Sequence, residues 1–283
     1  MSNISLDVSA KIDSALAELL ETMDRHARAL NTPFFVAGAT ARDLILDLGY
    51  QISAGRVTRD LDLAVMVEGW DAYDRLKQAL VATGKFVENS RVHHRLLYEG
   101  SWPVDLIPFG PVESPSGTIA WPPDRDQEMN VLGFREILEQ PLLVRIRKGL
   151  DVPVASLAGL AVMKLIAWHE RRDERDEADM ALLLKQHAAA GNEERLFGEQ
   201  QDLLRAEGHD HERAGARLLG RDMAHLMAPA TRAAVLTVLR DFADPETSDQ
   251  LIIAISHALG MDRYQEAQAL LARLKQGIEE TVA

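Results

Sequence analysis

The sequence of 283 residues contains no cysteine. A disulfide scaffold, a thiol nucleophile and a Cys-ligated zinc site are therefore excluded. It also lacks any run of about 18 apolar residues, so we expect no membrane-spanning helix and no membrane partner. The first residues lack a basic stretch followed by an apolar one, which is the pattern of a secretory signal. Together these absences favour a cytoplasmic protein.

Basic residues are in short supply. The chain has 31 Lys and Arg against 44 Asp and Glu, which gives a formal net charge of −13. This balance argues against broad, non-specific binding to a polyanion, although basic side chains that cluster locally could still bind one. The sequence has no Gly-x-Gly-x-x-Gly, no Gly-x-Ser-x-Gly and no complete P-loop motif, so it offers none of these signatures of dinucleotide, hydrolase or P-loop sites.

The hydrophobic pattern predicts a mixed α/β region over residues 1–150, followed by an all-α region over 151–283. In the first region we expect helices over 9–30, 40–48 and 71–83 and strands over 34–37, 61–67, 86–87, 95–98, 104–108 and 142–146. Residues 111–130 are rich in Pro, Gly, Ser and Asp and predict a long loop. In the second region we expect helices over 156–171, 174–187, 193–206, 211–226, 229–241, 246–258 and 262–277.

Three acidic residues stand in or beside apolar strands. Asp60 and Asp62 are two positions apart, so in a strand they point to the same face. Asp105 lies inside the apolar stretch Val104–Ile107, where an acid is costly unless it is paired or binds a cation. If the two strands are neighbours, the three carboxylates favour Mg²⁺, of which two ions could serve phosphoryl transfer. The alternative is that Asp60 pairs with Arg59 at a strand end and that Asp105 is an edge or bulge residue.

A second element joins a strand to a helix through Gly38, followed by Ala39, Thr40 and Arg42. A glycine permits close approach of the backbone, and the free N–H groups at a helix start suit phosphate. The hydroxyl of Thr40 could cap the helix or contact phosphate. The same pattern is also a routine strand–turn–helix connection.

The order of these elements resembles the polymerase-β-like nucleotidyltransferase superfamily. Phe35–Leu44 is similar to its first motif, Thr58–Leu63 to its Asp-x-Asp motif and Val104–Ile107 to its third motif. The resemblance implies a nucleotidyltransferase fold, with a mixed sheet and flanking helices, followed by a helical domain. It also implies roles for the residues named above, with Ala39 in place of the usual second Gly or Ser. Metal binding and catalysis would fall to Asp60, Asp62 and Asp105, and nucleotide binding to Gly38, Ala39, Thr40 and Arg42.

A further stretch, Leu157–Asp179, is similar to the Lys…Arg-Asp-x-x-Asp segment of AbiEii-type toxin nucleotidyltransferases. The resemblance implies that Lys164 contacts the triphosphate, that Asp176 completes the nucleotide site, and that Asp179 has a catalytic or polar role at the acceptor. A lysine in an apolar helix needs an anion. The alternatives are a Lys that snorkels to solvent and a salt-bridged surface run.

The sequence thus predicts a Mg²⁺-dependent enzyme that moves a nucleoside monophosphate from an NTP to an acceptor hydroxyl. By resemblance the acceptor would be RNA, such as a tRNA 3′ end, and a partner would be an antitoxin protein. Two other hypotheses stay open at this stage. One is a small-molecule nucleotidyltransferase of the aminoglycoside type, and the other is a non-catalytic module that binds a nucleotide or a partner.

Overall fold

The computed structural model describes residues 6–55, 60–240, 249–260 and 263–281. The chain divides into two compact units, Met1–Ser156 and Leu157–Ala283. The predicted boundary at residue 150 coincides with the start of strand β10 (Leu150–Val154), which pairs within the first unit. That the two units are independent domains stays a prediction. In the described ranges, no helix is both long enough and apolar enough to cross a membrane.

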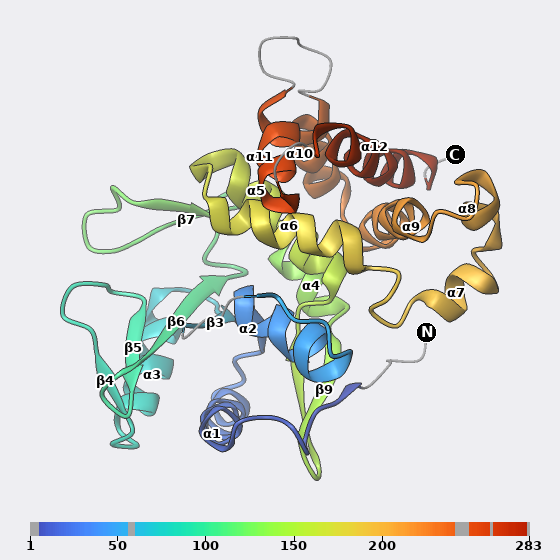
Figure 1. The fold of residues 1–283 in the computed structure, drawn as a ribbon. Coiled ribbons are helices and arrows are strands. Elements are labelled where there is room, and N and C mark those ends of the chain that lie inside the picture. The colour runs from blue at the N-terminus through green and yellow to red at the C-terminus, as the bar shows by residue number, and fades with distance from the viewer. Residues whose placement is uncertain (1–5, 56–59, 241–248, 261–262, 282–283) are drawn as a thin grey trace. The chain divides into compact units, whose positions relative to one another are not determined.

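The first unit is built on a mixed eight-stranded sheet, drawn in blue and green in Figure 1. Its strand order is β1-β9-β10-β2-β3-β6-β5-β4. The strands are β1 (Leu6–Asp7), β2 (Phe34–Ala37), β3 (Leu61–Met66), β4 (Phe86–Glu88), β5 (Arg95–Tyr98), β6 (Trp102–Phe109), β9 (Leu142–Arg147) and β10. All four residues of β2 are buried, as expected for a strand with neighbours on both sides. The predicted mixed sheet, followed by helices, is confirmed.

Helices pack around this sheet: α1 (Ser14–Ala29), α2 (Gly38–Asp43), α3 (Trp70–Val81) and α4 (Phe134–Glu139). Helix α1 is shorter than the predicted 9–30 because Asp13 caps it, accepting hydrogen bonds from the N–H groups of Ala15 and Leu16. It buries one apolar face and contacts α3. Helix α2 continues into a wider π-type turn, η1 (Leu44–Gly49), where the prediction gave one regular helix.

Two sequence predictions need correction. The predicted loop over 111–130 contains a two-stranded sheet of β7 (Thr118–Ala120) and β8 (Glu128–Asn130). These strands have three residues each, too few for a period-two pattern to be visible. The predicted helix over 193–206 is two short helices, α7 (Glu193–Phe197) and α8 (Gln201–Ala206), with Gly198 ending the first. Helix α4 was not predicted at all.

The described part of the second unit is helical. Besides α7 and α8 its helices are α5 (Leu157–Arg171), α6 (Glu174–Gln186), α9 (His211–Leu226), α10 (Pro229–Arg240), α11 (Asp249–Leu259) and α12 (Tyr264–Glu280). The predicted starts at 246 and 262 lie outside the described residues.

Helices α9 and α12 approach each other at two glycines. A Cβ built on Gly277 would lie 2.0 Å from the carbonyl oxygen of Arg217, and one on Gly220 would lie 2.2 Å from that of Leu274. Both obstacles are backbone atoms, which cannot rotate away. The backbones of the two helices are therefore in direct contact, which only glycine allows.

We predict that Gly277→Ala lowers the free energy of unfolding by about 2 kcal/mol or more, because overpacking outweighs the better helix propensity of Ala. Gly69→Ala is the control, since its Cβ would meet no atom within 4 Å. Urea unfolding followed by circular dichroism measures both. An unchanged midpoint for Gly277→Ala would contradict this close approach.

Candidate active site

The three predicted acids lie together in the first unit. Strand β3 pairs with β6 in parallel, and the register places Asp62 directly beside Asp105. Asp60 immediately precedes β3, and the guanidinium of Arg95 contacts both Asp60 and Asp105. Asp105 is buried, whereas 43% of the Asp60 side chain is exposed. The result is a carboxylate centre with one buried and one open side.

The loop after β2 closes on this centre. Ala37 pairs with Asp62 across β2 and β3, so Gly38 stands next to that carboxylate. Gly38 has a φ of +60°, and a Cβ there would lie 1.9 Å from Oδ2 of Asp62. The hydroxyl of Thr40 donates a hydrogen bond of 3.1 Å to the carbonyl oxygen of Asp60. Glycine is thus required here both for backbone conformation and for space.

The two other predicted nucleotide contacts of this loop are buried. Ala39 is 9% exposed and Arg42 only 2% exposed. The Nε and Nη2 atoms of Arg42 donate to Oδ1 of Asp43 at 2.8 and 2.6 Å. A nucleotide role for Ala39 and Arg42 therefore stays a prediction. Arg59, the alternative partner of Asp60, lies outside the described residues.

Arg95 is the functional candidate that the sequence analysis missed. Its Nε and Nη2 atoms donate to the two oxygens of Asp105 at 2.7 and 2.8 Å, and Nη2 lies 3.5 Å from Oδ2 of Asp60. Hydrogen bonding to Asp105 raises the pKa of Arg95 above its ordinary value, so the guanidinium is always charged. The strand pairing of the β5–β6 hairpin is the feature that would have indicated Arg95. Tyr98 pairs with Trp102 across the turn, and this register places Arg95 opposite Asp105.

His94 also lies near Asp105. Its Nε2 atom is 3.9 Å from Oδ2 of Asp105, and its ring centre is 4.9 Å from that of Trp121. Burial lowers the pKa of His94 below its ordinary value, against the opposing effect of Asp105. The imidazole is therefore neutral at pH 7, and it contributes a polar edge to the acid centre without adding charge.

Two carboxylates of the centre have the chemistry of ligands for a divalent cation. Asp60 and Asp62 carry the hard oxygen donors that Mg²⁺ prefers, and the space left by Gly38 is filled by the Asp62 carboxylate itself. Both oxygens of Asp105 instead accept hydrogen bonds from Arg95. In the ranges that the structure describes, no group of three His, Cys, Asp or Glu side chains is arranged to hold a metal. A metal-binding role for all three acids stays a prediction.

The predicted residues of the second unit form their own cluster. Nζ of Lys164 lies 2.9 Å from Oδ1 of Asp176 and 2.7 Å from Oδ2 of Asp179. Arg171 donates to both oxygens of Asp176 at 2.7 and 2.8 Å. Both acids are almost fully buried. The anion that Lys164 needs is thus supplied within its own unit, by two acids from the start of α6.

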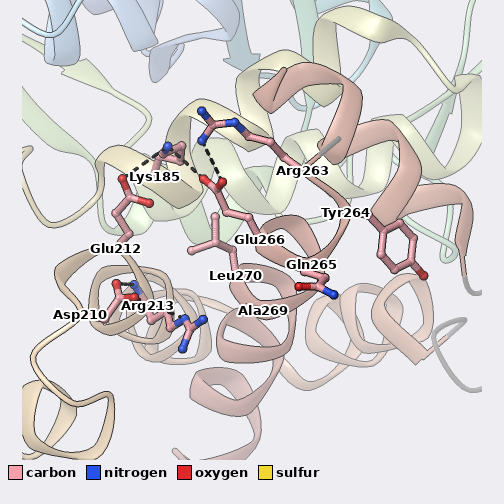
Figure 2. A pocket seen from close by; sticks show the side chains of 10 residues that line it. All are labelled: Lys185, Asp210, Glu212, Arg213, Arg263, Tyr264, Gln265, Glu266, Ala269 and Leu270. Carbon is pink, nitrogen blue, oxygen red and sulfur yellow. Dashed lines mark hydrogen bonds and ion pairs between the residues drawn. The ribbon is translucent and has the colours of Figure 1, made fainter. Parts of the chain in front are cut away.

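A cavity of about 1070 Å³ lies elsewhere in the second unit. Figure 2 shows the side chains that line it. Its charged groups form ion pairs with one another: Lys185 lies 3.0 Å from Glu266 and 3.4 Å from Glu212, and Arg263 lies 2.8 Å from Glu266. Cations and anions are equal in number among the lining side chains, so the cavity offers no net charge to attract a phosphate. We do not place the active site there.

The model of the nucleotidyl transferase AbiEii toxins, of type IV toxin–antitoxin systems, matches residues 21–272. The chain belongs to the AbiEii family. It is a nucleotidyltransferase, and the resemblance seen in the sequence is confirmed. No curated protein sequence matches this AbiEii chain.

Several solved structures are similar to this AbiEii chain, among them an antibiotic-resistance factor and a CCA-adding enzyme. The antibiotic-resistance factor ANT(2'')-Ia is 15% identical, over 70% of this chain and 99% of its own, with a TM-score of 0.38. A CCA-adding enzyme in complex with ATP is 14% identical, over 96% of this chain and 72% of its own, with a TM-score of 0.27.

We predict that Gly38→Ala reduces nucleotidyl transfer about 100-fold, because the new methyl group displaces the Asp62 carboxylate. Gly84→Ala is the matched control: its φ is +75°, but its Cβ would meet no atom within 4 Å. Both variants carry a similar backbone strain, so Gly84→Ala controls for that part of the lost thermal stability, and Gly38→Ala should lose more because of its overlap with Asp62. Equal transfer rates for the two variants would refute the contact between Gly38 and Asp62.

A second prediction concerns the Lys164 cluster. Lys164→Ala leaves two buried acids without this cation and should cost about 3–5 kcal/mol of unfolding free energy. Arg175→Ala removes a cation whose side chain is 71% exposed beside Asp173, and should cost less than about 1 kcal/mol. Chemical denaturation compares the two. Similar small losses would show that burial does not strengthen the Lys164 pairs.

Proposed function

We propose that this AbiEii nucleotidyltransferase uses Mg²⁺ to transfer a nucleoside monophosphate from an NTP to the 3′ hydroxyl of an RNA, such as a tRNA, and that it acts as a toxin. The observation that carries the proposal is the adjacency of Asp62 and Asp105, with Asp60 beside them. Carboxylates gathered on two adjacent strands are suited to a metal-assisted displacement at phosphorus.

The reaction is an in-line substitution at the α-phosphorus. The acceptor oxygen forms a bond to phosphorus, the bond from phosphorus to the oxygen bridging the α- and β-phosphates breaks, and pyrophosphate leaves. Mg²⁺ held by the aspartates would neutralise charge on the phosphates and so assist attack by the acceptor oxygen. The protein supplies positions and charges for the reacting groups.

Each residue of the first unit has a proposed part. Asp60 and Asp62 would hold the cation, and the absence of a side chain at Gly38 makes room for the Asp62 carboxylate. Asp105 is the predicted third ligand and, once released by Arg95, the predicted acceptor of the proton of the attacking hydroxyl. Thr40 fixes the segment before β3 through its hydrogen bond to Asp60.

Residues of the second unit have predicted parts of their own. Lys164 and Asp176 are predicted nucleotide contacts, and Asp179 is a predicted polar group at the acceptor. Their mutual ion pairs give them fixed positions within that unit.

The net charge of −13 restricts how RNA could bind. A long polyanion would be repelled by most of the surface, whereas a strand end needs only a few neutralised phosphates. We therefore propose recognition of an RNA end rather than of an extended helix. An antitoxin protein is the proposed partner, in keeping with the toxin–antitoxin family.

The test is transfer of label. The full chain is incubated with Mg²⁺, total bacterial RNA and each α-³²P-NTP in turn. We expect one NTP to label RNA, and chelation of the metal to abolish the labelling. The Asp60→Ala/Asp62→Ala variant should lose the activity and keep its thermal midpoint, because it removes like charges without opening the core.

Asp74→Ala is the control for removal of an exposed acid, and should label RNA as the unaltered protein does. Pyrophosphate release without labelled RNA would indicate that the acceptor is a small molecule or a protein instead of RNA. No release with any NTP, or transfer that survives loss of both Asp60 and Asp62, would overturn the proposed function.

A further inference from the structure

The acid centre contains its own cation. Arg95 grips Asp105 with two parallel hydrogen bonds of 2.7 and 2.8 Å, the geometry in which a guanidinium binds a carboxylate most firmly. Asp105 is 8% exposed, so this pair is largely shielded from water. An ion pair of this kind is costly to break, because the acid left behind is buried and charged.

The guanidinium also faces the second acid. Its Nη2 atom lies 2.8 Å from Oδ2 of Asp105 and 3.5 Å from Oδ2 of Asp60. Arg95 therefore occupies the space between these two carboxylates. A metal bridging Asp60 and Asp105 needs oxygens at about 2.1 Å and would have to expel the guanidinium. The proposed cation on Asp60 and Asp62 requires no oxygen from Asp105.

We propose that Arg95 is a resident counter-ion that withholds Asp105 from metal, so that the free protein binds one divalent cation, through Asp60 and Asp62. The inference rests on the proposed function for the metal centre itself, and goes beyond it in fixing the number of ions and the residue that limits it. Arg95 is a positioning residue, since it acts through Asp105.

The pairing register supports this assignment. Arg95 and Asp105 are cross-strand partners in the β5–β6 hairpin, and Asp105 and Asp62 are partners across β6 and β3. Arg95, Asp105 and Asp62 thus lie in one row across the adjacent strands β5, β6 and β3. Backbone pairing, rather than a flexible loop, holds the guanidinium at the centre.

The experiment is a titration of the nucleotide-free full chain with Mn²⁺, which prefers the same oxygen ligands, followed by electron paramagnetic resonance. We expect one bound Mn²⁺ per chain for the unaltered protein. Arg95→Gln should gain a second Mn²⁺ or bind the first at least about tenfold more tightly, because a positive charge beside the metal is removed. Arg95→Lys keeps the charge and should bind one ion, as the unaltered protein does.

Two variants separate this effect from misfolding. Arg145→Gln removes an arginine that grips Asp151 in the same two-bond geometry in the same unit, and should leave Mn²⁺ binding unchanged. Arg95→Gln/Asp105→Asn replaces the pair by neutral amides, and should return to one Mn²⁺ at the original affinity. A gain that persists in this double variant would overturn the inference.

The inference is also overturned if the unaltered protein binds two ions, if it binds none, or if Arg95→Gln behaves like the unaltered protein. These results are independent of the RNA-labelling test. If the protein labels RNA and binds two ions, the proposed function is supported and the inference about Arg95 is wrong. If the protein binds one ion and transfers no nucleotide, the proposed function is wrong, whereas the inferred number of bound ions is supported.

Discussion

The parallel pairing of β3 with β6 is the constraint on which the active site depends. It fixes Asp62 beside Asp105 at the ordinary spacing of neighbouring strands, so two like charges cannot move apart without breaking the sheet. Three neighbouring features reduce the repulsion between these carboxylates. Arg95 neutralises the buried Asp105, Asp60 is exposed to solvent, and the absence of a side chain at Gly38 makes room for the Asp62 carboxylate. Each feature follows from holding negative charges together in a folded sheet.

Much of this site can be read from the sequence, for a physical reason. An acid within an apolar strand is expensive, so Asp62 and Asp105 stand out from the many surface acids of the chain. Arg95 gives no such signal, because an arginine at the start of a strand is common. Only the pairing register shows what it faces. The same limit applies to β7 and β8, which are stabilised by their partner and by the burial of Ile119.

Lys164 illustrates a different limit. Its place in an apolar helix correctly indicates a need for a negative partner, but a sequence does not say where that partner comes from. The structure supplies it from Asp176 and Asp179 at the start of the next helix. Arg171 adds a second cation to Asp176. Because these charges are paired with one another, the second unit needs no ligand to neutralise them. The side chains of the cluster are therefore ordered before any substrate binds.

The short turn between β5 and β6 has a consequence for how such a protein can change over evolution. Side chains alternate between the two faces of a strand, so one residue gained or lost at Glu99–Ser101 would turn the side chain of Arg95 away from Asp105. An insertion in the loop between β7 and β8 moves neither residue. Variation in length should therefore accumulate in the loop between β7 and β8. It should be absent from the turn between β5 and β6, even though both are exposed hairpin ends.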